Sequence, residues 1–230
     1  MTRVAFIAAL PGELKPLVNG WPHSDRNGVQ FWARRNDEEE WIAACAGVGQ
    51  QAATRAFAAI EDGGPIDLIF SIGWAGALRA DLQPGMAYNM AGAIDVRTGE
   101  RFNCDAHAGE QWLVTSPKVA GEAEKRRLSS TYNASLVDME AAAIARLAKM
   151  REIPFYCFKG ISDAFDAQLP DFNRFITPNG QFQTGRLALY ALLRPWYWPA
   201  LIRMGENSRR ASQGIADSLR DFLDGQFSDE

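Results

Sequence analysis

The sequence predicts an α/β fold: a single-domain, three-layer α/β/α arrangement around a central, twisted, mixed sheet. Short apolar runs of strand length alternate along the chain with segments of helical spacing. One strand–helix–strand run has the length of a βαβ unit, which indicates parallel pairing. The 230 residues suffice for one substantial core, so we expect residues 1–230 to form one domain.

In the first half of the chain, apolar runs bounded by turn residues predict strands. The expected strands are 3–10, 28–35, 39–49 and 66–78, and the segment 50–62 is an expected helix. Ala52, Ala56, Phe57 and Ile60 recur on one side of that helix. The strand 66–78 runs into a glycine-rich turn, Gly73–Gly76.

In the second half, the expected strands are 85–96, 110–116 and 155–161, and the expected helices are 120–132 and 136–151. From Thr184 the pattern is helical to the end, with a break at Arg194-Pro195. We therefore expect a C-terminal helical extension over about 184–230. Its last helix carries one apolar stripe, which is formed by Ala211, Ile215, Leu219, Phe222 and Leu223.

Charge and cysteine usage exclude several classes of protein. The net charge is −4 and no stretch is strongly basic, which argues against a nucleic-acid partner. Cys45, Cys104 and Cys157 are scattered without a CxxC motif, as is typical of reduced thiols in a cytoplasmic protein. His23 and His107 have no partner at ligand spacing, so we expect no metal, and nothing points to a cofactor.

Three carboxylates stand where predicted elements begin or end. Glu13 follows the first strand, Glu140 lies at a helix start, and Asp163 follows a late strand. Taken singly, each is interpreted as a helix N-terminal acid or a cap. Glu13, the Gly73–Gly76 turn and Asp163 all follow predicted strands, so we expect them to meet where such sheets bind ligands, beyond the carboxyl ends of the strands.

Five motifs give these residues a family context: "VAFIAALPGEL", "GVG" at 47–49, "SIGWAGAL", "VDMEAAAIA" and "GISDAFD". Their order and spacing resemble the nucleoside phosphorylase and nucleosidase superfamily over roughly residues 3 to 166. The nearest branch is similar to the 5′-methylthioadenosine/S-adenosylhomocysteine nucleosidases.

The resemblance implies a task for each carboxylate in cleavage of an N-ribosidic bond. Asp163 is expected to protonate the purine leaving group at N7, and Glu13 to orient the attacking water. Glu140 is expected to accept from the ribose 2′- and 3′-hydroxyls, with Met139 packed on the sugar. The reaction passes through an oxocarbenium-like sugar, which calls for an acid on the side of the base and a nucleophile on the opposite face.

Further substrate-binding residues follow from the same resemblance. Gly73 and Trp74 are expected to line the nucleophile side of the sugar, and Ala9, Ser162 and Val119 to contact the substrate. Val119 is our candidate for the residue that stacks on the base. We expect burial beside apolar neighbours in strand 155–161 to help Asp163 keep its proton near neutral pH.

The sequence departs from the family in the glycine turn. The family commonly has Gly-Ser-Ala-Gly there, whereas this chain has Trp74 in place of the serine. The arginines typical of phosphorylases are also missing, and Arg34, Arg35 and Arg79 are interpreted as solvated surface residues. We therefore favour water over phosphate as the nucleophile. The alternatives are a phosphorylase and a nucleoside-binding module whose catalysis has lapsed.

The C-terminal segment 185–212 carries no motif that we can match to the short nucleosidases. We expect Trp196, Tyr197 and Trp198 to form the packing face of an interrupted helix. The alternatives are a lid over a bulky 5′-group and a weak contact with a membrane surface. The tail and "LVTSPKVA" are similar to hopanoid-associated phosphorylases, which implies an adenosine with a hopane skeleton at C5′. The resemblance also implies a homo-oligomer.

Overall fold

The computed structural model describes residues 1–105 and 109–227, so His107, for which no metal partner is expected, lies outside the described residues. The strands are β1 (Thr2–Ala8), β2 (His23–Arg26), β3 (Val29–Arg35), β4 (Glu39–Cys45), β5 (Leu68–Ala77), β6 (Ala87–Asp95), β7 (Arg101–Asn103), β8 (Gln111–Thr115), β9 (Leu136–Asp138) and β10 (Phe155–Asp163). The helices are α1 (Pro11–Leu14), α2 (Gln50–Glu61), α3 (Glu122–Tyr132), α4 (Ala141–Met150), α5 (Thr184–Leu192) and α6 (Trp198–Phe227), with short 3-10 turns η1 (Phe172–Phe175) and η2 (Pro195–Tyr197).

These strands form one mixed sheet in the order β10-β6-β8-β9-β5-β1-β4-β3-β2, with β7 paired to β6. β5 also pairs with β10, so the strands from β5 through β9, β8, β6 and β10 close back on β5. β1, β5 and β10 are parallel to one another. Their carboxyl ends therefore meet at one edge, and β1 and β10 lead there to Glu13 and Asp163.

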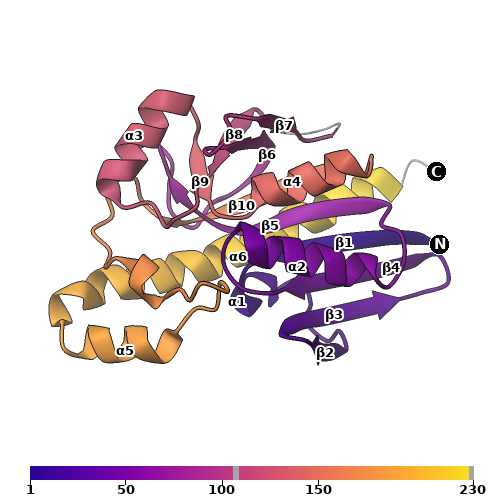
Figure 1. Cartoon of the computed structure of the whole chain (residues 1–230), viewed down its shortest axis with the longest axis horizontal. Coiled ribbons are helices and arrows are strands. Elements are labelled where there is room, and N and C mark those ends of the chain that lie inside the picture. The colour runs from indigo at the N-terminus through magenta and orange to yellow at the C-terminus, as the bar shows by residue number, and fades with distance from the viewer. Residues whose placement is uncertain (106–108, 228–230) are drawn as a thin grey trace.

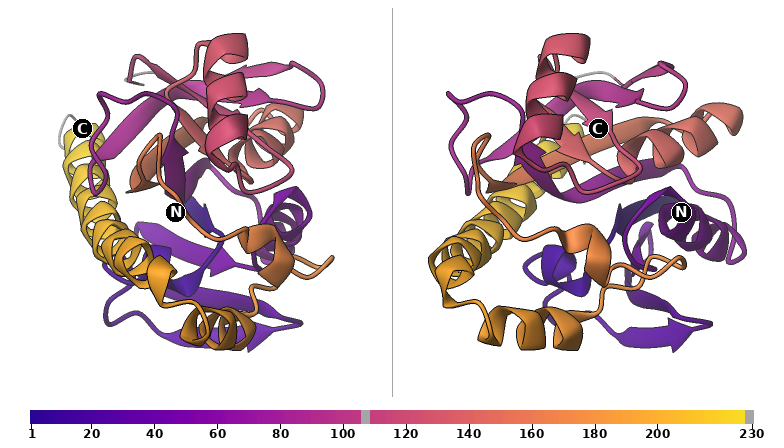
Figure 2. Two further views of the ribbon diagram at one scale, coloured as in Figure 1. Left: turned by 90° about the vertical axis from the view of Figure 1, so that its left-hand side faces the viewer. Right: turned by 60° about the vertical axis from the view of Figure 1, so that its left-hand side comes forward.

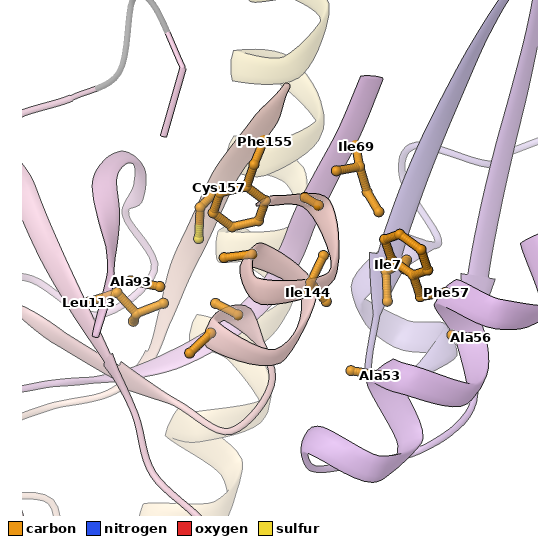
Figure 3. Close-up of a cluster of buried hydrophobic side chains, with 14 of the residues drawn as sticks. Ile7, Ala53, Ala56, Phe57, Ile69, Ala93, Leu113, Ile144, Phe155 and Cys157 are labelled. Carbon is orange, nitrogen blue, oxygen red and sulfur yellow. The ribbon is translucent and has the colours of Figure 1, made fainter. Parts of the chain in front are cut away.

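Helices cover both faces of the sheet (Figures 1 and 2). Successive residues of a strand point to opposite faces, so β1 places Ile7 in one apolar cluster and Phe6 in another. α2 and α4 cover the first cluster with Phe57 and Ile144 (Figure 3), and α6 covers the second. This is the three-layer α/β/α arrangement that the sequence predicts.

Two of the expected boundaries are wrong. The segment 136–151 is not one helix, because Leu136–Asp138 forms β9 between β5 and β8 and α4 begins only at Ala141. Asp138 Oδ2 accepts the N–H of Ala141 at 2.9 Å and so marks the helix start. Gly73–Gly76 is not a turn after a strand but part of β5 itself, hydrogen-bonded to β10.

The C-terminal helices are only partly as expected. The break at Arg194-Pro195 is confirmed, and so is the apolar stripe, which α6 packs against the sheet. The expectation that the aromatic segment packs inward is wrong, because Trp196 is 67% exposed and Trp198 is 46% exposed. Among the described residues, no helix has the length and apolar character needed to cross a bilayer.

Candidate active site

Glu13 lies in α1, directly after β1, with its carboxylate buried. Its Oε2 accepts the N–H groups of Ala9 at 2.8 Å and Leu10 at 2.7 Å, and its Oε1 accepts the N–H of Trp74 at 2.7 Å. Burial raises the pKa of Glu13, while these three bonds and the charge of Lys159 act in the opposite direction. The N–H groups fix the carboxylate in one orientation.

Gly73 and Trp74 form the part of β5 that faces Glu13. Gly73 has φ +141°, and a Cβ at this position would lie 2.7 Å from Glu13 Oε1, so only glycine allows the close approach. The Trp74 indole points towards α6, where its Nε1 donates to Ser208 O at 3.0 Å and Ser212 Oγ at 2.8 Å. Its one side-chain donor is therefore used to anchor α6.

Asp163 ends β10 opposite Gly76 of β5, just past an irregularity in the strand register. Ser162 Oγ donates to Asp163 Oδ1 at 2.6 Å. The ammonium of Lys125, a buried residue of α3, donates to Asp163 Oδ2 and, at 2.5 Å, to Ala164 O. The groups in contact with Asp163 are thus a hydroxyl and an ammonium, and not the apolar neighbours expected from the sequence.

A second buried ammonium lies beneath the other acids. Lys159 of β10 is 1% exposed and its Nζ lies 3.0 Å from Asp138 Oδ2 and 3.1 Å from Ser71 Oγ. Burial lowers the pKa of Lys159, but Asp138, Cys157 and Glu140 outweigh it and the net direction is upward. Lys159 therefore remains an ammonium in the core.

Glu140 precedes α4 and reaches back to the loop after β4. Its Oε1 accepts the N–H of Gly49 at 2.5 Å, and Met139 Cε lies 3.9 Å from the Cβ position of Gly49. Burial and the Asp138 carboxylate raise the pKa of Glu140 to about 8, and Lys159 opposes this. The charge of Glu13 also raises the pKa of Glu140.

The predicted catalytic pair flanks one short stretch of β5. Glu13 lies against Gly73, and Asp163 Oδ2 lies 3.2 Å from the Cβ position of Gly76. Three residues of a strand span about 10 Å. The separation between these two contact points suits a ligand of nucleoside size.

Two cavities adjoin these residues. One, of about 340 Å³, is lined by Ala9, Gly12, Cys45, Gly47 and Trp74, among others, and contains no lysine or arginine among its described lining residues. The other, of about 480 Å³, is lined by Ser162 and Asp163 together with residues of α6.

Val119 is held through its backbone by η1. Its N–H and C=O are both occupied by the side-chain amide of Asn173 in η1, at 2.9 and 3.1 Å, and Val119 lines neither cavity. The structure therefore offers no support for base stacking by Val119 in this conformation.

A protein-family model described as "Phosphorylase superfamily" matches residues 3–103 and 96–189. The chain belongs to the phosphorylase superfamily. The expected family and the expectation of an enzyme are thereby confirmed. A search of curated proteins found no match to this chain.

Solved structures share the fold of this phosphorylase-superfamily chain. The 5′-methylthioadenosine/S-adenosylhomocysteine nucleosidase of Helicobacter pylori, with butyl-thio-DADMe-Immucillin-A, has a TM-score of 0.73 and 16% identity, covering 98% of this chain and 99% of its own. A futalosine hydrolase from the same species has a TM-score of 0.73 and 15% identity, covering 97% of this chain and 98% of its own. The S-adenosylhomocysteine nucleosidase of Streptococcus pyogenes, with 5-methylthiotubericidin, has 0.72 and 18%, covering 97% of each chain.

Sequence reasoning missed both buried lysines of this superfamily member. Lys159 carries a detectable signal, since it interrupts the apolar strand sequence "FYCFKGIS". Lys125 carries none, because it lies in a helix, "EAEKRRLSSTY", whose other charged residues are solvated. Only the packing of α3 reveals which of these charges is turned inward.

Proposed function

We propose that the protein hydrolyses the N-ribosidic bond of a 5′-modified adenosine and releases adenine. The observation that carries this proposal is the placement of Glu13 and Asp163 at the two ends of the Gly73–Gly76 stretch. Cleavage of such a bond needs an acid on the side of the base and a nucleophile on the opposite face of the sugar. The nucleosidases and the futalosine hydrolase named above support the reaction class.

In this proposal Glu13 orients the attacking water, with its carboxylate held by three backbone N–H groups. Glu140 and Met139 hold the ribose hydroxyls and pack against the sugar. The raised pKa of Glu140, about 8, means that its carboxyl both donates and accepts hydrogen bonds near neutral pH. Ala9, through its N–H, positions Glu13 beside the substrate.

Asp163 delivers the proton to the purine, and Ser162 holds its second oxygen. Because the Lys125 ammonium donates to Asp163 Oδ2, we propose that the proton in this hydrogen bond is the one that reaches the base. The role of Val119 at the base then requires that Asn173 release its backbone groups.

Water is favoured over phosphate by the cavity beside Glu13, which has no lysine or arginine among its described lining residues. Two of the arginines considered from the sequence are engaged elsewhere. Arg34 lies over the Trp41 ring at 3.9 Å, and Arg79 pairs with Asp81 at 2.6 Å.

The decisive experiment measures adenine release from methylthioadenosine, S-adenosylhomocysteine and adenosine, with and without phosphate. Release without phosphate, yielding a free sugar, supports the proposal. A requirement for phosphate and formation of a sugar 1-phosphate would establish phosphorolysis instead. Binding without turnover would favour a lapsed, nucleoside-binding module. A 5′-substituent as large as hopane is tested by the same assay on an adenosine bearing a long apolar 5′-group.

We also propose a homo-oligomer, on the family resemblance. Light scattering coupled to size exclusion tests it, and a monomer at micromolar concentration would refute it.

A further inference from the structure

The C-terminal hairpin presents most of the exposed apolar side chains of the described residues. Its α5, η2 and the start of α6 lie at the left-hand end of the molecule in Figure 1. We define the C-terminal apolar face as six residues, each between 46% and 68% exposed: Leu189, Leu192, Leu193, Trp196, Trp198 and Ile202. Among the residues whose exposure the structure describes, the other large apolar residues of comparable exposure are three scattered methionines, Met1, Met86 and Met150. Six exposed apolar side chains within 14 residues of sequence distinguish this face from ordinary protein surface, where such residues are scattered.

The hairpin is held by its own contacts. Tyr190 packs edge-on against Phe175 of η1 at 5.3 Å, and the Arg194 guanidinium lies over the Tyr190 ring at 3.8 Å. Trp198 Nε1 donates to Ala191 O at 2.8 Å, so its polar atom is satisfied within the hairpin. α5 has no buried residue despite its apolar sequence. The exposed side chains are thus presented by a formed structure.

The charge of the same segment is opposite to that of the rest of the chain. Residues 184–213 contain five arginines and one glutamate and so have a net charge of +4. Because the whole chain has a net charge of −4, the other 200 residues have a net charge of −8. Arg186, Arg194, Arg203 and Arg209 have no ion pair with a carboxylate within the described part of the chain. Four arginines of this segment therefore carry charge that no described carboxylate pairs with.

We propose that the C-terminal apolar face docks on the surface of an anionic lipid bilayer. Tryptophan and leucine side chains bordered by arginines match the boundary between acyl chains and anionic headgroups. A symmetric contact with a second copy would bring together two segments 184–213, each of net charge +4, which is unfavourable.

Docking would also bring a cavity of the candidate active site to the lipid boundary. Ala200, Arg203 and Met204, which lie in α6 next to Ile202 of the apolar face, line the 480 Å³ cavity together with Asp163. An amphiphilic nucleoside in the bilayer would then meet the site without crossing water. This extension rests on the proposed function, whereas docking itself does not.

The test is co-sedimentation of the full chain with vesicles of phosphatidylcholine containing about one-third phosphatidylglycerol, and with pure phosphatidylcholine vesicles. We expect binding to the anionic vesicles that weakens with salt. Leu193→Gln with Trp196→Gln should weaken it at least about tenfold. Arg186→Gln with Arg209→Gln should weaken it by about fivefold for each charge removed. Met150→Gln, on a residue that is 72% exposed outside the face, is the matched control and should bind normally.

Equal binding by all variants, or no binding to anionic vesicles, would overturn the proposal. A wild-type dimer that the Leu193/Trp196 variant converts to a monomer, without vesicle binding, would assign the face to a second copy instead. Adenine release from methylthioadenosine separates this result from the proposed function. Release that is equal in all variants without vesicle binding refutes docking alone, and vesicle binding without any release refutes the enzymatic proposal alone.

Discussion

The substitution Asp163→Asn tests the proposed acid and its unexpected lysine partner together. An amide has no acidic proton to give, so adenine release should fall about 10²–10⁴-fold. The structure adds a stability effect, because Lys125 is 2% exposed and would lose its counter-ion. An amide oxygen still accepts from the ammonium, so we expect a loss of about 2–3 kcal/mol rather than the full cost of an unpaired buried charge.

The double variant Lys125→Met, Asp163→Asn separates the two effects. The double variant lacks the buried Lys125 ammonium that Asp163→Asn leaves without a counter-ion. Its free energy of unfolding should therefore exceed that of Asp163→Asn, while its adenine release stays low. Urea unfolding followed by tryptophan fluorescence and chromatographic measurement of adenine release provide the two readouts. Wild-type turnover in Asp163→Asn would refute the acid assignment. Strictly additive stability losses would refute the inference that the buried pair is energetically coupled.

Three further substitutions test the remaining geometry. Glu140→Gln should flatten the pH dependence of stability between pH 4.5 and 8. Burial raises the pKa of Glu140 from its ordinary value of 4.5 to about 8 in the folded state, so the folded state binds more protons than the unfolded state in this range. Wild-type stability therefore falls, on the order of 3 kcal/mol, as pH rises. Gly73→Ala, which drives a methyl group into Glu13, should cost at least about 1 kcal/mol and most of the activity, as measured by urea unfolding and adenine release. Trp74→Phe should cost about 1–2 kcal/mol in urea unfolding, since it leaves Ser208 O and Ser212 Oγ without their donor.

Local sequence pattern predicted the parts of the fold whose burial is continuous. The strand ending in Asp163 and the stripe on α6 follow directly from apolar periodicity. Leu136–Asp138 was misassigned because a three-residue strand beside an alanine-rich helix has no period of its own, and only its pairing with β5 and β8 decides it. The outward face around Trp196 was missed because periodicity identifies an apolar side without telling what covers it.

The candidate site shows the same limit. A resemblance placed Glu13, Glu140 and Asp163, but it attached no cation to any of them. Lys125 of α3 pairs with Asp163, which is 38 residues away in the sequence. Lys159 of β10 pairs with Asp138, which is 21 residues away. Sequence spacing does not specify such contacts.

Lys159→Met tests whether the Lys159 ammonium offsets the cost of burying Asp138, Glu13 and Glu140 in the folded state. Asp138 pairs with Lys159 directly, and Glu13 and Glu140 both have their pKa lowered by its charge. Removing it leaves three buried carboxyl groups without a cation, at a cost of about 3–5 kcal/mol at pH 8. At pH 5 Glu140, whose pKa is raised to about 8, is protonated in the folded state and needs no counter-ion, so the loss in unfolding free energy should shrink there.

Lys149→Met is the matched control, since Lys149 is exposed and lies 3.3 Å from Glu100 at the surface. Its effect should stay below about 1 kcal/mol at either pH. A loss for Lys159→Met that is the same at pH 5 and pH 8 would mean that the lysine acts through packing of its aliphatic stem. The shared-charge explanation for three acids in one core would then fail, because it requires the cost to follow their ionisation.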